Sequence, residues 1–567
     1  MSLNSALSIG RTALMTHQAA IEVTGNNLAN AATRGYHRQT INLEPIRSQE
    51  IQTGIFVGRG VQVQTIQRQV NQGLEARLRN GISQEAGTTT RQDLLSQIEA
   101  LQGEFSDSDL SSQLNVFFNS FSELANRPTD NSLRSLVVQQ GSALASYVRN
   151  MRSGLSDIRT QVDQNIDAAV VAANDLLERI EQLNTQIVQQ ERGTGGASTL
   201  RDQRELLLGE LSQYLDISVH EQTSGAADVF VGSLPIVLDG KSRGLEVRRE
   251  TDADGQLQIS VLIAADKSIL TPTTGRLGAL IATRQEDVNH ALTVLDDFAN
   301  QLIYQVNKVH SQGQGLTGFD SVTAANRVFD TSAALNTAAA GLDFTPTHGS
   351  FQINVTQKST GQRVTSTINI DLDGLGSDTT LTSLTASLNG VSNVAASIAP
   401  DGRLTIGGDT ADFEITFAND NSGALAALGI NTFFTGGDAQ DIDINSVVNS
   451  SPGLIAAGLD HVPGDNGNAL ALAALRDQKL AALGGLSLPE VWNRHVEDFA
   501  IRLGQTNAQL TADTAVRQNL ESQQQAVSGV NVDEEAINLL AFQRAYQASA
   551  RFLNVVNEMM DTLLGII

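Results

Sequence analysis

Apolar residues recur at alternating spacings of three and four near both ends of the chain. This spacing puts them on one face of a helix and gives the 3.5-residue period that lets two helices wind around each other. The N-terminal series is Leu3, Leu7, Gly10, Leu14, His17, Ile21, Thr24 and Leu28. The C-terminal series is Leu539, Phe542, Tyr546, Ser549, Leu553, Val556, Met560, Leu563 and Ile567. We predict one helix at each end and take the apolar members of both series as an assembly interface.

An apolar stripe that continues to the last residue, with nothing after it to cover it, requires a partner helix. The candidates are the helix at the other end of the same chain and copies of either helix in neighbouring subunits. A hairpin within one subunit would bury both stripes without any assembly, so the pattern leaves both arrangements open. We favour assembly and define residues 1–60 with 520–567 as a terminal coiled-coil region.

Helical periodicity also dominates much of the interior. We expect a second helical region from about Arg91 and a very long helix across Leu133–Ile187, because the apolar period continues there without a proline. Further helices are predicted over Leu277–Val309 and from about Ala469. Residues 61–213, 276–312 and 470–519 should together form a helical stalk, with a strand in the alternating segment Gly60–Ile66.

Two stretches change to an alternating apolar and polar pattern with Gly and Asp at the turns, which is typical of strands. Residues 214–275 are predicted to form a small β-rich domain. Residues 313–469 are predicted to form an inserted, acidic β-rich domain. The predicted fold class is therefore a multidomain α+β protein with paired terminal heptad helices, a long helical stalk and inserted β-rich domains.

Composition narrows the function classes. The 567 residues carry a net charge of −25, which argues against nucleic acid as a partner because phosphate binding needs a basic face. The chain has no cysteine, so disulfides, thiolate metal sites and cysteine nucleophiles are excluded. Its apolar runs are too short for a membrane span, and its N-terminus lacks the pattern of a cleaved signal peptide. We expect a cytoplasmic protein or one exported by a route without a cleaved signal.

Candidate chemistry in the sequence is sparse, and we predict no catalytic, cofactor-binding or metal site. A Gly-Lys-Ser at Gly240–Ser242 lacks the earlier glycine of a phosphate-binding loop, because that position is Pro235, so a turn between strands is favoured. Asp371, Asp373 and Asp378 surround two glycines, a composition that suits Ca²⁺ but equally suits an ordinary turn. The eight histidines include no helical metal pair.

Several segments resemble the bacterial flagellar rod, hook and hook-associated proteins. The N-terminal signature of that family is similar to Asn26–Tyr36 (NNLANAATRGY), and the segment that follows it is similar to Gly60–Gln69. The C-terminal helix of the family resembles Ser528–Leu564. Two internal segments, Leu200–Ser212 and Leu428–Gly436, resemble landmarks of the hook-associated members. The family signature often has Pro at position 34 and a small polar residue at position 37, so we expect no specific role for Arg34 or His37.

This resemblance implies a structural protein, not an enzyme, placed at the junction between hook and filament. It implies self-association into a ring or short tube, with the hook protein and a second junction protein as partners. It also implies secretion to the extracellular flagellum, with an export chaperone bound to the C-terminal helix.

Three alternatives remain. A hook or distal-rod protein is less compatible with the long stalk pattern. A surface adhesin could use the acidic β-rich insert, and an enzyme carried on that insert would lack a recognisable nucleophile or metal site.

Overall fold

The computed structural model describes residues 3–52, 54–103, 109–191, 196–251, 257–459, 462 and 464–566, and they form two compact units. Unit 1 contains Met1–Leu94, Val162–Thr283 and Gln505–Ile567. Unit 2 contains Leu95–Gln161 and Arg284–Gly504. Three long helices contribute residues to both units: α2 (Gln72–Gln102), α4 (Asn131–Glu191) and α12 (Leu488–Ser528).

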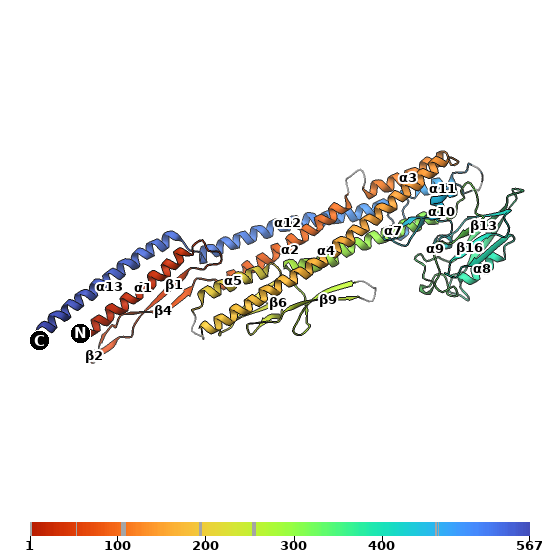
Figure 1. Ribbon diagram of the computed structural model, residues 1–567. Coiled ribbons are helices and arrows are strands. Elements are labelled where there is room, and N and C mark those ends of the chain that lie inside the picture. The colour runs from red at the N-terminus through yellow and green to blue at the C-terminus, as the bar shows by residue number, and fades with distance from the viewer. Residues whose placement is uncertain are drawn as a thin grey trace. The chain divides into compact units, whose positions relative to one another are not determined.

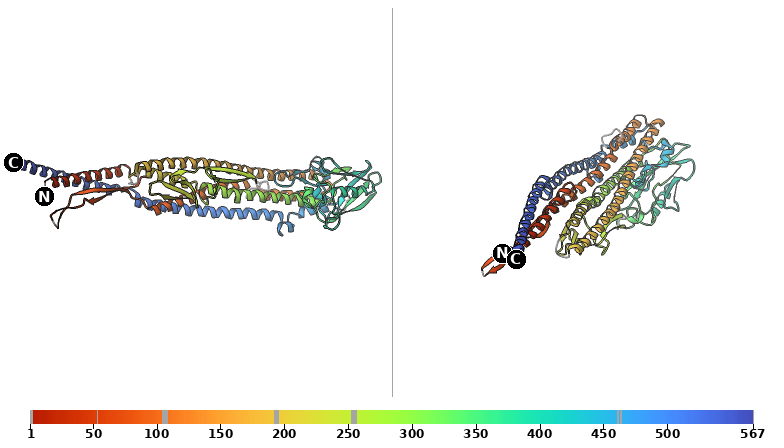
Figure 2. Two further views of the ribbon diagram at one scale, coloured as in Figure 1. Left: turned by 90° about the horizontal axis from the view of Figure 1, so that it is seen from below. Right: turned by 60° about the vertical axis from the view of Figure 1, so that its left-hand side comes forward.

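The terminal part of unit 1 consists of two long helices and a strand ribbon. The helices α1 (Leu3–Ala29) and α13 (Val532–Ile566) lie side by side, with the two chain ends close together (Figures 1 and 2). The antiparallel strands β1 (Gln39–Pro45) and β4 (Val61–Arg68) pack against α1. Between them in sequence, β2 (Gln49–Gln52) and β3 (Ile55–Val57) form a separate hairpin.

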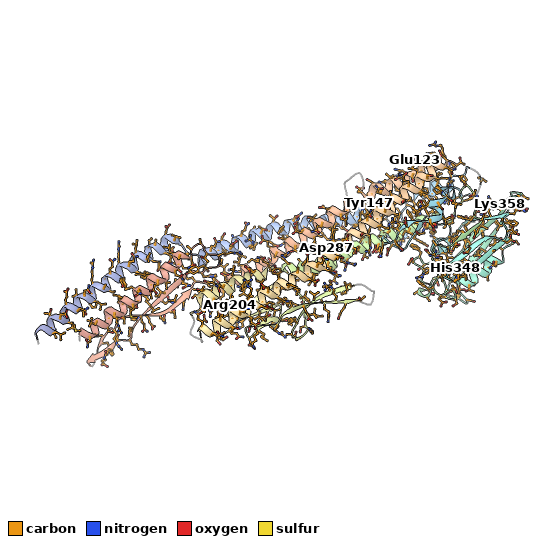
Figure 3. All side chains as sticks on the ribbon, viewed as in Figure 1. Glu123, Tyr147, Arg204, Asp287, His348 and Lys358 are labelled. Atoms are coloured by element: carbon orange, nitrogen blue, oxygen red, sulfur yellow. The ribbon has the colours of Figure 1, made fainter. Side chains whose placement is uncertain are left out.

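The rest of unit 1 combines helices with two small antiparallel sheets. Its helices include α5 (Ser198–Ser212) and α6 (Gly275–Thr283). One sheet has its strands in sequence order: β5 (Ile217–Glu221), β6 (Ala227–Val231), β7 (Leu234–Leu238) and β8 (Lys241–Ser242). In the other sheet, β10 (Leu257–Ile263) lies between β9 (Leu245–Thr251) and β11 (Ile269–Leu270). Arg204, labelled in Figure 3, donates from α5 to Asn184 Oδ1 at 2.9 Å and to the Gly225 carbonyl at 2.7 Å.

Unit 2 is built around an aromatic-rich helical core. Its helices are α3 (Leu110–Asn126), α7 (Asn289–His310), which follows a short π-helical segment (Arg284–Val288), α11 (Gly467–Ala474) and parts of α2, α4 and α12. The rings of Phe117 and Phe121 on α3 pack against Phe433, with centroids 5.6 and 5.7 Å away. Trp492 is almost fully buried beside Phe298. The periodic apolar residues of these helices therefore meet within this unit.

The insert of unit 2 carries most of its strands. Three strands form a sheet in the order β14 (Arg363–Ile370), β13 (Gly349–Gln357), β17 (Phe413–Ala418), and three others in the order β12 (Ser321–Thr323), β16 (Leu404–Gly408), β15 (Val394–Ile398). A short pair consists of β18 (Phe434–Thr435) and β19 (Asp443–Ile444), and the helices are α8 (Leu381–Asn389), α9 (Ala424–Leu428) and α10 (Ser446–Ser450). Phe351, Ile353 and Val355 alternate along β13 into a buried apolar cluster, as the period of two predicts.

Two buried polar side chains hold backbone segments of unit 2 together through hydrogen bonds. Arg134 donates to the carbonyls of Pro128 (2.6 and 3.0 Å), Gly453 (3.2 Å) and Ile455 (2.6 Å), and its burial lowers its pKa to about 10. The fully buried His310 bonds through Nδ1 to the Asn431 carbonyl at 2.8 Å, and its Nε2 accepts from the Ala456 amide at 3.0 Å. Both ring nitrogens are satisfied by a neutral imidazole.

The predicted fold class is confirmed: paired terminal helices, a long helical stalk and inserted β-rich segments are all present. The expected start of the second helical region near Arg91 is wrong, because α2 begins at Gln72. The buried face of its first turns contains Glu75, Arg79 and Ser83, so it carries no apolar stripe that a pattern search could find. The four-part division of the chain stays a prediction. None of the described helices has the length and apolarity needed to cross a membrane.

Candidate assembly interface

The helices α1 and α13 run antiparallel, with Gly10 against Leu553 and Asn27 against Glu535. The predicted apolar residues of α1 are half-buried: Leu3, Leu7, Leu14, Ile21 and Leu28. On α13, Val556 is buried, and the half-buried predicted residues are Leu539, Phe542, Tyr546, Leu553 and Met560. The pairing predicted from the two series is therefore present inside one chain.

The last two residues of the predicted series differ from the others. Leu563 is 49 % exposed, and Ile567 lies outside the described residues. The two antiparallel contacts put Leu3 about level with Met560, so Leu563 extends past the described part of α1.

Gly10 supplies the closest approach between the two helices. A Cβ atom added there would lie 2.7 Å from Leu553 Cδ2, closer than packed carbon atoms come. The absent side chain thus leaves a notch in α1 that the Leu553 side chain fills. Small residues at one position and a large apolar residue opposite are how two helices pack closely.

The sequence pattern missed a second, more deeply buried face of α1. Its members also alternate spacings of four and three but are small or polar: Thr16, Ala20, Val23 and Asn27. This face packs on the β1–β4 ribbon, and the Thr16 hydroxyl donates to the Val61 carbonyl at 3.3 Å. A search for periodic apolar residues could not find this face. Its residues have helical spacing, but Thr16 and Asn27 are polar.

Asn27 forms hydrogen bonds with both the N-terminal and the C-terminal segments of the chain. Its Nδ2 donates to the Gln39 carbonyl at 2.8 Å and to Glu535 Oε2 at 3.1 Å, while its Oδ1 accepts from the Gln39 amide at 2.9 Å and the Tyr36 hydroxyl at 2.8 Å. Arg38 donates from Nε to Glu535 Oε1 at 2.8 Å, so the Glu535 carboxylate is shared. The N-terminal and C-terminal segments that resemble the flagellar family therefore meet at one point.

His37 lies at the centre of an adjacent polar cluster and is only 2 % exposed. Its Nδ1 is 2.7 Å from Asp202 Oδ1 on α5, and its Nε2 is 3.5 Å from Glu75 Oε1 on α2 and 3.3 Å from Gln524 Nε2 on α12. Arg68 Nε donates to the same Asp202 oxygen at 2.7 Å. The cluster joins the segment after α1 to three other helices of unit 1.

Burial alone lowers the pKa of His37, but the hydrogen bonds with Asp202 and Glu75 outweigh it and raise the pKa to about 9. His37 is therefore a cation held between two carboxylates. Our expectation that position 37 has no specific role is wrong. Sequence reasoning missed it because Asp202 is 165 residues away, although Asp202 lies in one of the segments singled out by resemblance. Arg34, by contrast, is exposed.

An open groove of about 1320 Å³ lies beside this cluster, within unit 1. It is bounded by residues 31–38, by α2 and α5, and by the turn between α12 and α13. Its walls carry side chains of both signs, and the ion pairs Arg79–Glu205 and Arg517–Glu85 join its sides. A pocket for a small substrate is usually lined mainly by apolar and aromatic side chains, which these charged walls are not.

α13 also carries an open apolar stripe outside the predicted series. Its residues are 55–68 % exposed: Ile537, Leu540, Val555 and Met559. The matching outer positions of α1 are mostly polar, with Met15 as the one large exposed apolar side chain among its described residues. α13 thus has two apolar faces, and α1 covers one of them.

The Gly-Lys-Ser segment proves to be a tight turn. Gly240 precedes β8, which pairs with β7, and Asp239 and Gly240 both have positive φ. The segment lies between two strands, whereas a phosphate-binding loop would open a helix. The prediction of a turn at this position is confirmed.

Comparison with known proteins agrees with this arrangement. Residues 95–324 match the Flagellar hook-associated protein FlgK helical domain. Residues 7–37 match the Flagella basal body rod protein family, and residues 523–566 match the Flagellar basal body rod FlgEFG protein C-terminal family. The last two matches contain α1 and α13, the two helices that pack together.

Relatives match over almost the whole chain. Flagellar hook-associated protein 1 of Escherichia coli (strain K12) is 26 % identical over 578 residues, covering 100 % of both chains. Its counterpart in Bacillus subtilis (strain 168) is 25 % identical over 567 residues, covering 99 % of this chain and 97 % of that one. The structure of the flagellar hook junction protein FlgK from Burkholderia pseudomallei shares the fold, with a TM-score of 0.51 and 16 % identity. The match covers 80 % of this chain and 100 % of that chain.

The antiparallel terminal helices and the three family matches define a class, the structural proteins that build the axis of the bacterial flagellum. Within that class, the chain is similar along almost its whole length to flagellar hook-associated protein 1.

Proposed function

We propose that this protein is a building block of the junction between flagellar hook and filament, and that it assembles there through α1 and α13. The observation that carries the proposal is the second apolar face of α13, which remains open after α1 has covered the first. A buried Ile, Leu, Val or Met side chain contributes about 1.5–3 kcal/mol relative to its exposed state. Four such side chains on one helix are a strong driving force for association with another subunit.

In this mechanism, α1 and α13 first pair within each subunit, with Leu553 seated at Gly10. The outer face of α13 then packs against terminal helices of neighbouring subunits, and repetition of that contact closes a ring or short tube. The two surfaces of this assembly contact the hook protein on one side and a second junction protein on the other. Residues 537–563 supply the contact between subunits.

We also propose that the protein is secreted to the extracellular flagellum with a chaperone on α13. The same four exposed side chains that later contact neighbouring subunits require cover beforehand, because exposed apolar patches promote nonspecific association. A small helical chaperone on this stripe would supply that cover and would have to leave before assembly. Removal of residues 528–567 should abolish its copurification.

Three consecutive residues of α13 allow a sharp test. Val555 is on the open stripe, Leu553 contacts α1, and Asn554 is exposed and polar. Val555→Asp should leave the monomer as stable as wild type yet prevent its incorporation into flagella. Asn554→Asp, which places the same charge one residue away, should assemble normally. Normal incorporation of the Val555→Asp protein would contradict assembly through the open stripe.

The place in the flagellum is tested by electron microscopy of cells lacking the gene, with flagellin assayed in the medium. Bare hooks of normal length with flagellin shed as monomer are the expected result. Missing hooks would instead assign the protein to the rod or hook. Normal filaments would refute a structural role at the junction.

A further inference from the structure

A cluster of three metal-ligating side chains lies at one edge of the inserted sheet, apart from the assembly interface. His348, labelled in Figure 3, directly precedes β13, and Asp371 directly follows β14. These strands pair with Gly349 opposite Ile370, so the antiparallel register brings His348 and Asp371 together. Asp373 follows two residues later, and each of the three offers a ligand atom within 4.8 Å of the other two.

The loop after β14 is held in shape by its own backbone. The Thr379 amide donates to the Asp371 carbonyl at 2.6 Å, and the Asp371 amide donates to the Thr379 hydroxyl at 2.8 Å. The Leu375 amide donates to Asp373 Oδ1 at 2.8 Å, which orients that carboxylate. The two nearest carboxylates are therefore presented beside His348 by fixed backbone and not by mobile side chains alone.

One carboxylate oxygen lacks the partner that its burial calls for. Asp371 Oδ1 is shielded from solvent and accepts no hydrogen bond from the residues that the structure describes, although its side chain as a whole is 49 % exposed. It lies 3.2 Å from His348 Nδ1, which itself accepts a hydrogen bond from the Leu372 amide at 3.3 Å. Either a proton on Nδ1 or a bound cation satisfies the Asp371 oxygen.

We propose that His348, Asp371 and Asp373 bind a divalent transition-metal ion of the Zn²⁺ type. Nitrogen and carboxylate ligands of Zn²⁺ lie about 2.0–2.2 Å from the metal, so neighbouring ligand atoms of a tetrahedral site are about 3.3–3.5 Å apart. The observed separation of 3.2 Å between Nδ1 and Oδ1 suits that geometry. Three protein ligands leave the fourth position to water.

The imidazole distinguishes this site from a calcium loop. Ca²⁺ takes oxygen ligands, six to eight of them, whereas one imidazole with two carboxylates suits Zn²⁺ and similar ions. Asp378 belongs to the sequence motif but serves another purpose, because its Oδ1 accepts from the Gly374 amide at 3.1 Å and shapes the loop. The ion would join the start of β13 to the loop after β14 and stiffen that edge of the insert.

The test is a titration of the full-length protein with Zn²⁺ alone and with Ca²⁺ alone, followed by calorimetry and by competition with a coloured chelator. We expect one Zn²⁺ bound per chain and no Ca²⁺. His348→Ala, Asp371→Asn and Asp373→Asn should each weaken Zn²⁺ binding at least about tenfold, since each removes a metal ligand. Asp378→Asn should stay within about threefold of wild type, since Asp378 is not a ligand.

The matched control is His220→Asn, which removes an exposed histidine from β5 in unit 1. It should bind Zn²⁺ like the wild-type protein. Fluorescence of Trp492, the one tryptophan of the chain and a core residue of unit 2, checks that each variant is folded. The proposal is refuted by a wild-type protein that binds no Zn²⁺, by unchanged binding in His348→Ala, or by Ca²⁺ binding in place of Zn²⁺.

Discussion

The helical core of unit 2 and the terminal helices of unit 1 bury their apolar residues to very different degrees. Phe117, Phe121 and Phe433 have no measurable exposure, and their rings pack against one another. On α1 and α13, by contrast, the predicted apolar residues are mostly half-buried, and four further apolar side chains on α13 are open. Unit 2 thus completes its core within one chain, whereas the terminal helices leave apolar side chains exposed.

The largest effect is expected from Leu553→Asp. The charged side chain would replace the group that fills the notch at Gly10, and an unpaired carboxylate next to apolar surface is strongly unfavourable. We expect complete loss of incorporation into flagella, while Trp492 fluorescence of unit 2 remains unchanged.

Asn554→Asp is the matched control for that variant, and it should incorporate normally. If Leu553→Asp also shifted the unfolding transition reported by Trp492, the terminal helices would not be independent of the unit 2 core.

Phe433→Ala is the reverse experiment. Removing a fully buried ring from the aromatic cluster should lower the free energy of unfolding of unit 2 by about 3–5 kcal/mol. Denaturant titration followed by Trp492 fluorescence measures it. Val116→Ala, at an exposed position of α3, should change stability by less than about 0.5 kcal/mol. Equal effects of the two substitutions would mean that unit 2 is not closely packed around Phe433.

The two regions should also differ in how their stability depends on pH, because each contains a buried histidine and the two pKa values are shifted in opposite directions. The pKa of His37 is raised to about 9, so the folded state holds its proton more tightly than the unfolded chain does. Its contribution is complete below pH 6.5 and is lost as the pH rises through about 9. The shift in pKa corresponds to about 3 kcal/mol. The protection factors of the amides of residues 31–38, which compare the exchange rate with that of an unfolded chain at the same pH, should therefore fall between pH 7 and 10, and His37→Gln should remove that fall.

The pKa of His310 is lowered to about 4, because burial disfavours the charged imidazole. Its contribution is present above pH 6.5 and is lost as the pH falls toward 4, when the unfolded chain gains a proton that the folded chain refuses. Unit 2, followed by Trp492, should thus weaken on the acid side. Loss of both regions at the same pH would show that these two histidines do not control their stability.

The smallest effect is expected from Gly10→Ala. One added methyl group overlaps Leu553 Cδ2, and such overpacking costs about 1–3 kcal/mol. Thermal unfolding monitored by circular dichroism measures it. A combined Gly10→Ala and Leu553→Ala variant should recover part of the loss, because the shorter side chain leaves room. An equal loss in the double variant would place Leu553 elsewhere than in the notch.

The elements that could be predicted from sequence were those whose residues repeat along one helix or strand. The apolar series predicted the helices α1 and α13 and left open whether they pair with each other or with other subunits, and the alternation around Phe351 indicated a strand. Contacts between distant segments could not be predicted in this way. Neither the meeting of His37 with Asp202 nor that of His348 with Asp371 leaves a periodic trace, because each depends on how separate elements fold together. The start of α2 was missed because ion pairs, not apolar side chains, line its buried face.

The contacts of Arg134 should make the surrounding backbone insensitive to the salt concentration of the medium. Its guanidinium is bonded to the carbonyls of Pro128, Gly453 and Ile455, and among the described residues no carboxylate is paired with it. Dissolved salt screens the interaction between exposed charges, with a screening length of about 8 Å at 0.15 M. It weakens short hydrogen bonds to buried carbonyl groups much less. The hydrogen bonds that hold the backbone around Gly453 should therefore persist at both low and high salt concentration.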